Sequence, residues 1–219
     1  MFTGIVQTKA VVSAFVGNDK FRTLTLAVGS EHLNNLTIGA SIAINGVCLT
    51  VTHFEQTSST GLTSSTGEDH SIGIVKFDII DETLNLTNLK NLSQGQYVNF
   101  ERSVTFGTEL GGHIVSGHIQ TSATVQDIEN SINNCKMTLM LDKAWMKYIL
   151  HKGFVSVNGS SLTVGNTTET SFDLHLIPET LKLTNLSEAK VGDKLNIEVD
   201  QQTYTTVETV ERYLKEHRR

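Results

Sequence analysis

Hydrophobic and polar residues alternate over short stretches along most of this chain. Residues 23–28, 41–44 and 154–157 place an apolar side chain at every second position, which is typical of half-buried strands. Asn45-Gly46 and Asn158-Gly159 directly follow two of these stretches, and Asn-Gly pairs favour tight hairpin turns. Many short strands separated by glycine-containing turns predict a mostly all-β fold built from a closed barrel or a sandwich.

A few stretches have helical spacing instead. One short helix is expected in each half of the chain, over residues 31–36 and over residues 142–150, where Trp145, Tyr148 and Ile149 form an apolar face. Residues 55–73 between two predicted strands are dominated by Ser, Thr and Gly. We interpret them as an elongated hairpin loop without a function of its own.

A third helix is predicted near the C-terminus, over residues 203–217. Val207, Val210 and Leu214 share one face of it, and charged residues cover the other. A helix this short is marginal alone, so it must pack on something. It packs either on its own barrel or against copies of itself from other subunits, and the narrow apolar stripe favours the second arrangement.

The sequence of the first half recurs in the second half. Residues 45–51 reappear as 158–164, and residues 3–7 reappear as 116–120 at the same offset. Later segments match at a smaller offset, which places extra residues of the first half between Val51 and Phe77. A duplication on this scale indicates two copies of one domain, and two copies of a binding domain suggest two molecules of one ligand or of two similar ligands.

The repeat sets the expected domain boundaries. Residues 1–110 form the first barrel, residues 111–200 the second, and residues 201–219 a C-terminal oligomerisation helix, with Gly111-Gly112 as the boundary between the barrels.

Composition narrows the class of protein. The 219 residues carry a net charge of −6, whereas a nucleic-acid-binding protein usually has a basic stripe. No run of residues approaches the length of an apolar membrane span, and no secretory signal is recognisable at the N-terminus. Cys48 and Cys135 lie at non-equivalent places in the two copies, which favours two free thiols in a reducing cytoplasm.

Four segments together resemble the riboflavin synthase family of tandem lumazine-binding barrels: residues 1–6, 45–51, 111–118 and 176–181. The resemblance runs in order from Met1 to about Leu214. It implies two six-stranded Greek-key barrels and a homotrimer. It also implies an enzyme that converts two molecules of 6,7-dimethyl-8-ribityllumazine, by transfer of a four-carbon unit, into riboflavin and 5-amino-6-ribitylaminouracil. No cofactor and no metal are expected. In this family the site joins the N-terminal barrel of one subunit to the C-terminal barrel of a neighbour and holds two lumazines.

This reaction needs stacked heteroaromatic rings, a base for a methyl proton and donors aimed at developing charge. Ser161 and Thr163 lie two residues apart on a predicted strand, so both face the same side. Cys48 and Thr50 occupy the same places in the first copy, so the copies differ where a donor and an acceptor site should differ. Cys48 is either a nucleophile or a packed small side chain, and the resemblance implies ligand contact.

Further site residues rest on the resemblance. His118, expected on a barrel strand, is either a candidate acid or base or a buried, satisfied histidine, and the resemblance favours the first role. Ser41 matches a position implicated in proton abstraction, and Asp200 matches one near the site of another subunit. Lys152 matches a ligand-binding lysine directed toward the ribityl chain. His113 also matches a motif position, but we expect it to be structural.

The complete set of expected substrate-binding residues follows both copies of the motif. It comprises Gly4, Ile5, Val6, Cys48, Leu49, Thr50, Asp78, Ile79, Ile80, Asp81, Glu82, Thr83, Gly117, His118, Ile119, Lys152, Ser161, Leu162, Thr163, His175, Leu176, Ile177, Pro178, Glu179 and Thr180.

The chain departs from the family pattern at Asn158, where the family commonly has Asp. Asn45 occupies the equivalent place in the first copy, so we interpret Asn158 as a turn-shaping residue rather than an essential base. Two other functions compete with the enzyme. A non-catalytic antenna would bind one lumazine or flavin and lose polar residues at its other site, and a generic β-barrel interaction module would leave the repeated polar residues unexplained.

Overall fold

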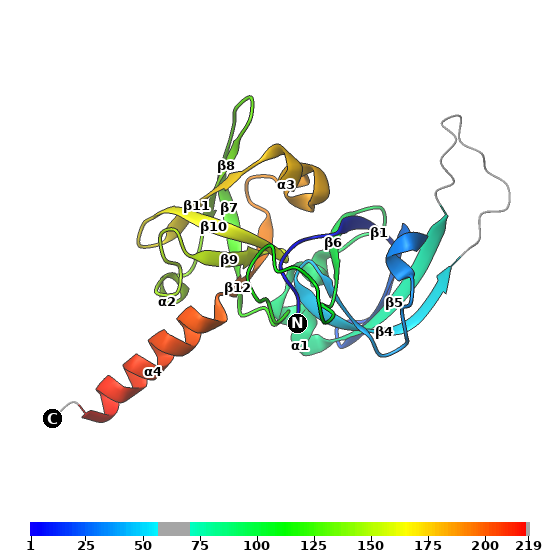
Figure 1. The fold of residues 1–219 in the computed structure, drawn as a ribbon, viewed down its shortest axis with the longest axis horizontal. Coiled ribbons are helices and arrows are strands. Elements are labelled where there is room, and N and C mark those ends of the chain that lie inside the picture. The colour runs from blue at the N-terminus through cyan, green and yellow to red at the C-terminus, as the bar shows by residue number, and fades with distance from the viewer. Residues whose placement is uncertain (57–70, 218–219) are drawn as a thin grey trace.

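The computed structural model describes residues 1–56 and 71–217 and contains two closed six-stranded antiparallel barrels side by side (Figure 1). The first barrel has the strand order β1-β2-β5-β4-β3-β6, and the second repeats this cyclic order as β7-β8-β11-β10-β9-β12. The strands of the first barrel are β1 (Thr8–Gly17), β2 (Phe21–Gly29), β3 (Ser41–Ile44), β4 (Val47–Gln56), β5 (Ile72–Ile80) and β6 (Tyr97–Arg102). Those of the second are β7 (Thr121–Asn130), β8 (Cys135–Met140), β9 (Phe154–Val157), β10 (Ser160–Thr167), β11 (Ser171–Leu176) and β12 (Lys194–Val199).

Each barrel closes around its own apolar core. Phe77 and Phe100 are fully buried in the first barrel, and Phe172 and Ile197 occupy the second. The alternation predicted over residues 23–28, 41–44 and 154–157 is confirmed in β2, β3 and β9. The predicted all-β tandem barrels are confirmed as well.

The two short helices predicted from spacing are both shorter than expected. The first is a 3₁₀-helix, η1 (Ser30–Leu33), because Leu33 enters the core and Asn35 then takes a left-handed conformation at φ 55°. The second is α2 (Lys143–Met146), which ends where Tyr148 and Ile149 turn into the second core.

Each barrel also contains a helical segment that spacing alone did not predict. α1 (Asp81–Leu86) and η2 (Asn88–Asn91) follow β5, while α3 (Pro178–Leu183) and η3 (Asn185–Glu188) follow β11. In both copies a threonine between the two helices donates its hydroxyl to the carbonyl four residues earlier, at 2.7 Å for Thr87 and for Thr184. The prediction of one short helix per copy was therefore wrong.

Six asparagines join the two barrels through an asparagine network: Asn45, Asn88 and Asn99, and their counterparts Asn158, Asn185 and Asn196. The Asn99 side chain donates to the Asn158 carbonyl at 2.8 Å, and the Asn196 side chain donates to the Asn45 carbonyl at 2.9 Å. These reciprocal bonds follow a pseudo-two-fold axis. A Cβ built on Gly46 would lie 2.6 Å from the Gly159 backbone, so only glycine allows the two hairpin turns to meet.

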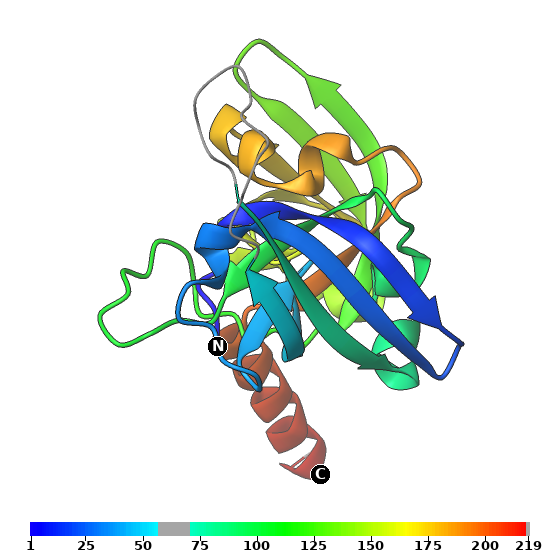
Figure 2. The same ribbon diagram turned by 90° about the vertical axis from the view of Figure 1, so that its right-hand side faces the viewer.

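α4 (Gln201–His217) projects away from the second barrel (Figures 1 and 2). Its first half packs on that barrel, because Tyr204 and Val207 contact the second core and Lys147 binds both Glu208 and Glu211. Its second half exposes Val210, Tyr213 and Leu214. The first half of α4 thus packs on its own barrel, and packing of the second half against copies of the chain stays a prediction.

The expected hairpin loop over residues 55–73 falls mostly outside the described residues. β4 and β5 pair up to Gln56 and Gly73, which flank it. Of the helices in the described part of the chain, none combines the length and apolar character that crossing a bilayer requires.

Candidate active site

The repeated polar side chains lie on the outer faces of two equivalent hairpins. We call the face of β3–β4 the first face and the face of β9–β10 the second face. Along β4 the buried Leu49 separates the half-buried Cys48 from the exposed Thr50. Along β10 the half-buried Ser161 and the exposed Thr163 flank Leu162, which packs against the second core. The prediction that each pair shares one side is therefore confirmed, and both pairs point away from the barrel interior.

The neighbouring strands give the two faces different chemistry. Ser41 on β3 pairs with Thr50, so this catalytic candidate joins the Cys48 face. The equivalent pair in the second barrel is Phe154 with Thr163, which places an aromatic ring where the first barrel has a hydroxyl.

Beside each face, the pairing between two neighbouring strands ends before the strands themselves end. β4 and β5 pair only as far as Val51 with Phe77, and β10 and β11 only as far as Val164 with Leu174. The following residues, 78–80 and 175–176, pair only with the strand on their far side, and Ile177 lies just beyond the end of β11. A flat heterocycle with N–H and C=O groups can bond to such an open edge in place of a strand.

Two segments cross between the barrels, the first strap (residues 2–6) and the second strap (residues 115–119). They pair with each other through Phe2 and Val115, whose backbones exchange hydrogen bonds of 2.8 and 3.0 Å. The Gly4 carbonyl accepts from the Ser161 N–H at 2.7 Å, and the Gly117 carbonyl accepts from the Cys48 N–H at 2.8 Å. Each strap therefore completes the face on the opposite barrel.

The second face contains a contact that sequence reasoning missed. His113 Nδ1 lies 2.6 Å from Ser161 Oγ, and its ring stacks on Phe154 with centroids 5.3 Å apart and planes 15° apart. Burial lowers the pKa of His113, and the negative charge of Asp200 opposes this shift. The imidazole is thus neutral at neutral pH and is placed to exchange a proton with Ser161. His113 belongs to the Gly111-Gly112-His113 segment and has no counterpart in the first copy. This difference between the copies is the feature of the sequence that could have indicated its role.

The sequence predicted that His118 lies on a barrel strand, and this prediction was wrong. His118 is also not buried. It is exposed in the second strap, ahead of β7, because the chain crosses to the first barrel before the strand begins. It directly follows Gly117, whose carbonyl accepts from the Cys48 N–H. It therefore belongs to the first face, whereas Ile5 takes the matching place at the second.

Lys152 and Asp200 lie beside the second face, since the Lys152 N–H donates to the Val164 carbonyl at 2.9 Å and the charge of Asp200 acts on His113. Lys152 has a φ of 63°, while its counterpart Gly39 has a φ of 87°. A lysine in a conformation that favours glycine costs free energy, and such strain is typical of functional positions. Asp200 accepts from the Thr203 N–H at 2.8 Å and from the Thr203 hydroxyl at 2.7 Å, which fixes it at the start of α4.

The remaining expected binding residues divide by exposure. The side chains of Val6, Leu49, Ile79, Ile119 and Leu176 are buried, so they can meet a ligand only through their backbone. The exposed group, which can present side chains, is Ile5, Asp78, Ile80, Asp81, Glu82, His175, Ile177, Pro178 and Glu179, with Thr83 and Thr180 half-buried.

A separate hollow of about 1000 Å³ lies between the barrels at the asparagine network. Its floor is already bonded internally, since Asn88 donates to Asn158 and Asn185 donates to Asn45, both at 3.0 Å. None of the candidate catalytic residues lines it. Among the described residues no group of three His, Cys, Asp or Glu side chains is arranged to hold a metal ion.

Comparison with known proteins identifies the family. A model of the lumazine binding domain matches residues 3–103 and 116–200. Riboflavin synthase of Escherichia coli (strain K12) is 45% identical over 215 residues, which cover 98% of this chain and 93% of that protein. This chain belongs to the riboflavin synthase family. Riboflavin synthase of Bacillus subtilis (strain 168) is 34% identical over 200 residues, covering 91% of this chain and 85% of that protein.

Solved structures agree on the architecture. LumP complexed with riboflavin matches with a TM-score of 0.77 at 26% identity, over 92% of this chain and 100% of that chain. LumP complexed with 6,7-dimethyl-8-(1'-D-ribityl) lumazine has a TM-score of 0.75 at 24% identity and covers the same shares, which supports the fold.

Proposed function

We propose that this chain is a riboflavin synthase that converts two 6,7-dimethyl-8-ribityllumazine molecules into riboflavin and 5-amino-6-ribitylaminouracil. The observation that carries the proposal is the presence of two equivalent faces with unlike polar groups on one chain. Ser41 and Cys48 serve one face, and His113 and Ser161 serve the other. A dismutation needs this combination, because its two substrates are identical while their roles differ.

The open ladder edges suit the bicyclic ring. Backbone groups of residues 78–80 and 175–177 would bond the pyrimidine portion, and the exposed Glu82 and Glu179 with Thr83 and Thr180 would bond the ribityl hydroxyls. Lys152 would contact the ribityl chain at the second face. Binding at fixed edges would orient the two rings before any bond forms.

The proton transfers are assigned to the second face. Neutral His113, bonded to Ser161, would accept a proton from the acidic 7-methyl group through the serine hydroxyl or directly. Thr163 would donate a hydrogen bond to the charge that develops. At the first face Ser41, Cys48 and His118 would polarise the ring that is attacked.

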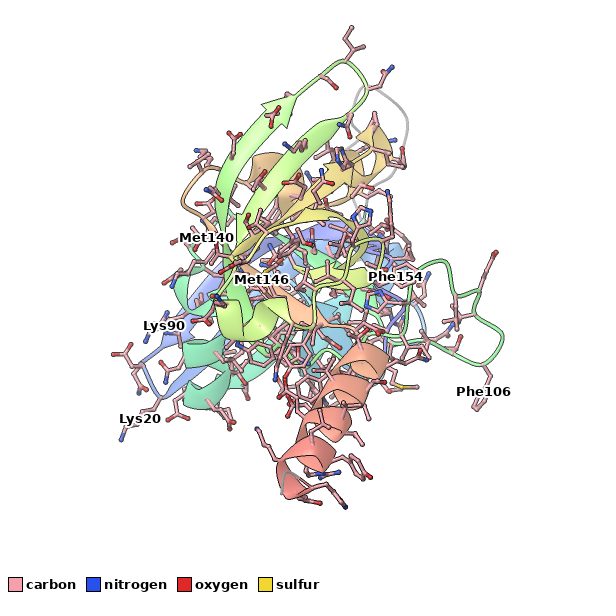
Figure 3. The ribbon with its side chains drawn as sticks, turned by 90° about the vertical axis from the view of Figure 1, so that its left-hand side faces the viewer. Lys20, Lys90, Phe106, Met140, Met146 and Phe154 are labelled. Carbon is pink, nitrogen blue, oxygen red and sulfur yellow. The ribbon has the colours of Figure 1, made fainter. Side chains whose placement is uncertain are left out.

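The complete site is proposed to need more than one subunit. The exposed half of α4, with Val210, Tyr213 and Leu214, supports a homotrimer that pairs a first face with the second face of a neighbour, two lumazines to a site. Phe106, fully exposed at the tip of the loop between β6 and β7, lies on the same side of the molecule as Phe154 (Figure 3). A cytoplasmic location and the expected domain boundaries stay predictions.

The non-catalytic lumazine- or flavin-binding antenna is the second candidate, since LumP, which resembles this chain in fold, was solved in complex with riboflavin. Purified protein with the lumazine alone, in the presence of a chelator, separates the two. The enzyme would consume two lumazines for each riboflavin formed. Saturable binding without riboflavin would establish the antenna, and activity that depends on a metal or a nicotinamide would refute the proposed reaction.

A further inference from the structure

Two buried glutamates occupy equivalent positions in the two barrels, and neither belongs to the candidate faces. Glu101 is on β6 and Glu198 is on β12, with exposed fractions of 3% and 2%. A carboxylate this deeply buried needs hydrogen bonds that compensate for the loss of water. Its partners therefore indicate what it stabilises.

The Glu198 carboxylate holds the second strap. Its Oε1 accepts from the Ser116 N–H at 2.6 Å and from the Ser116 hydroxyl at 2.7 Å, and its Oε2 accepts from the Gly117 N–H at 2.9 Å. Ser116 Oγ in turn accepts from the His118 N–H at 3.2 Å. Charge-assisted hydrogen bonds are stronger than neutral ones, so this carboxylate fixes the backbone on both sides of Gly117.

The strap that Glu198 holds serves the other barrel. Gly117 bonds Cys48 on β4, and a Cβ built on Gly117 would lie 2.6 Å from the Cys48 Cβ. A glutamate on the last strand of the second barrel thus sets the position of Gly117 and His118 at the face of the first barrel.

Glu101 holds the first strap in the same way, with fewer bonds. Its Oε1 accepts from the Thr3 N–H at 2.7 Å and from the Thr3 hydroxyl at 2.9 Å, and Thr3 Oγ1 accepts from the Ile5 N–H at 3.1 Å. Its Oε2 has no hydrogen-bond partner among the described residues. Burial raises the pKa of Glu101, and the hydrogen bonds from the strap only partly oppose this shift.

We propose that Glu101 and Glu198 are positioning residues for the reaction, each holding the strap that completes the face on the opposite barrel, with Glu198 as the stronger clamp. The assignment of the straps to substrate faces rests on the proposed function. The clamp itself can be measured without catalysis, because Cys48 lies under the second strap and is half-buried, whereas Cys135 is buried in a core.

The test is the rate at which a small thiol reagent modifies Cys48 in the full-length protein. Glu198→Gln keeps one oxygen for Ser116 but turns an amide N–H toward the Gly117 N–H. Losing one charge-assisted hydrogen bond shifts a local opening equilibrium by about tenfold, so Cys48 should react about tenfold faster. The Cys135 rate should not change, and KM for the lumazine should rise.

Glu101→Gln is the matched control, since it changes an equally buried glutamate that holds the first strap, whereas Cys48 lies under the second. It should leave the Cys48 rate within about twofold of wild type. Equal acceleration by both variants, or an unchanged Cys48 rate in Glu198→Gln, would overturn the proposal.

If Glu198→Gln does not fold, Ser116→Ala replaces it, with Thr3→Ala as its control. Ser116→Ala removes one of the three bonds to Glu198 and should accelerate only Cys48, and an unchanged rate would count against the clamp. Failure of wild-type turnover, in contrast, would refute the proposed function and leave the thiol measurement intact.

Discussion

At the scale of single residues, the chemistry of the second face depends on one short contact. His113 Nδ1 and Ser161 Oγ are 2.6 Å apart, and Phe154 supports the imidazole from one side. Removing either partner should lower turnover far more than it lowers stability, because neither side chain contributes to the barrel core. We expect His113→Asn, Ser161→Ala and His118→Ala to reduce turnover by about 10²- to 10⁴-fold.

Melting temperatures measured beside the rates provide the comparison. His53→Ala is the control for loss of a histidine outside both faces, since His53 is half-buried and its partner among the described residues is Glu55. A variant that loses activity and folded protein in parallel would have a structural role instead.

The same contact predicts a pH dependence. Burial depresses the pKa of His113 below the ordinary histidine value of about 6.5. Turnover that needs the neutral imidazole should hold above pH 6.5 and decline as the pH falls through the pKa of the folded state. The folded state also binds this proton less readily than the unfolded state, so His113 stabilises the fold above about pH 6.5 and that stability is lost on acidification. Rates and unfolding midpoints between pH 5 and 8 test both, and His113→Asn should remove this acidic decline.

Asn158 lies at the centre of the asparagine network, which explains its identity without catalysis. It is buried at a φ of 46°, its Oδ1 accepts from the Asn196 N–H at 2.9 Å, and its Nδ2 donates to Asn185. Asn158→Asp removes that donor and should destabilise the fold by about 1–3 kcal/mol. Turnover should change by less than about tenfold, equivalent to about 1.4 kcal/mol in the barrier.

Asn45→Asp makes the same change on the other side of the pseudo-two-fold axis, since Asn45 accepts from the Asn99 N–H at 2.9 Å. Denaturant unfolding of both variants should give matching losses. A large gain in turnover from Asn158→Asp alone would show that a carboxylate has a catalytic role there.

At the scale of elements, strands were predictable and the segments that complete the faces were not. Alternation identified β2, β3 and β9, because their side chains face either a core or solvent. Helical spacing failed over residues 31–36 and 142–150, where a few buried side chains decide the backbone path. The contacts of Gly4 with Ser161 and of Gly117 with Cys48 join residues far apart in the chain, so no local sequence pattern predicts them.

The second strap gives a prediction at this scale. Gly117 has a φ of 84° and contacts Cys48, so Gly117→Ala adds both backbone strain and a collision. Gly95→Ala adds only the strain, since Gly95 has a φ of 87° and open space around it. We expect Gly95→Ala to cost about 1–2 kcal/mol with turnover retained. Gly117→Ala should cost more and lose lumazine binding at the first face. Calorimetry and ligand titration measure both, and similar behaviour of the two variants would exclude a role for the close approach.

At the scale of the whole molecule, duplication lets one chain carry two related faces with different residues. The shared asparagine network and the crossed straps make the two barrels interdependent. The sequence repeat predicted the number of barrels and the equivalence of the faces. It could not predict that the strap of each barrel contacts the face of the other barrel, since this contact follows from packing across the pseudo-two-fold axis.

The packed first half and the exposed second half of α4 allow stability and assembly to be tested separately. Truncation after Thr209 keeps Tyr204, Val207 and Glu208 on the second barrel and removes the exposed Val210 and Leu214, together with the ion pair of Glu211 with Lys147. This variant should melt near wild type, because an exposed ion pair contributes little to stability. On the proposed assembly it should lose the homotrimer and most of its turnover, because dissociation would separate a first face from its neighbour's second face. Each face should still bind lumazine, since its residues lie within one chain.

Truncation after Asp200 should do more damage. It also uncovers Trp145 and Tyr148, whose rings lie against that of Tyr204. Tyr204 and Val207 are partly buried, so removing each side chain should cost less than the about 1.5–3 kcal/mol of a fully buried one. Light scattering gives the mass of each variant and ligand fluorescence reports binding. A chain truncated after Thr209 that stays trimeric and fully active would show that the exposed stripe of α4 has no part in assembly, and the partner surface would then have to be sought around Phe106.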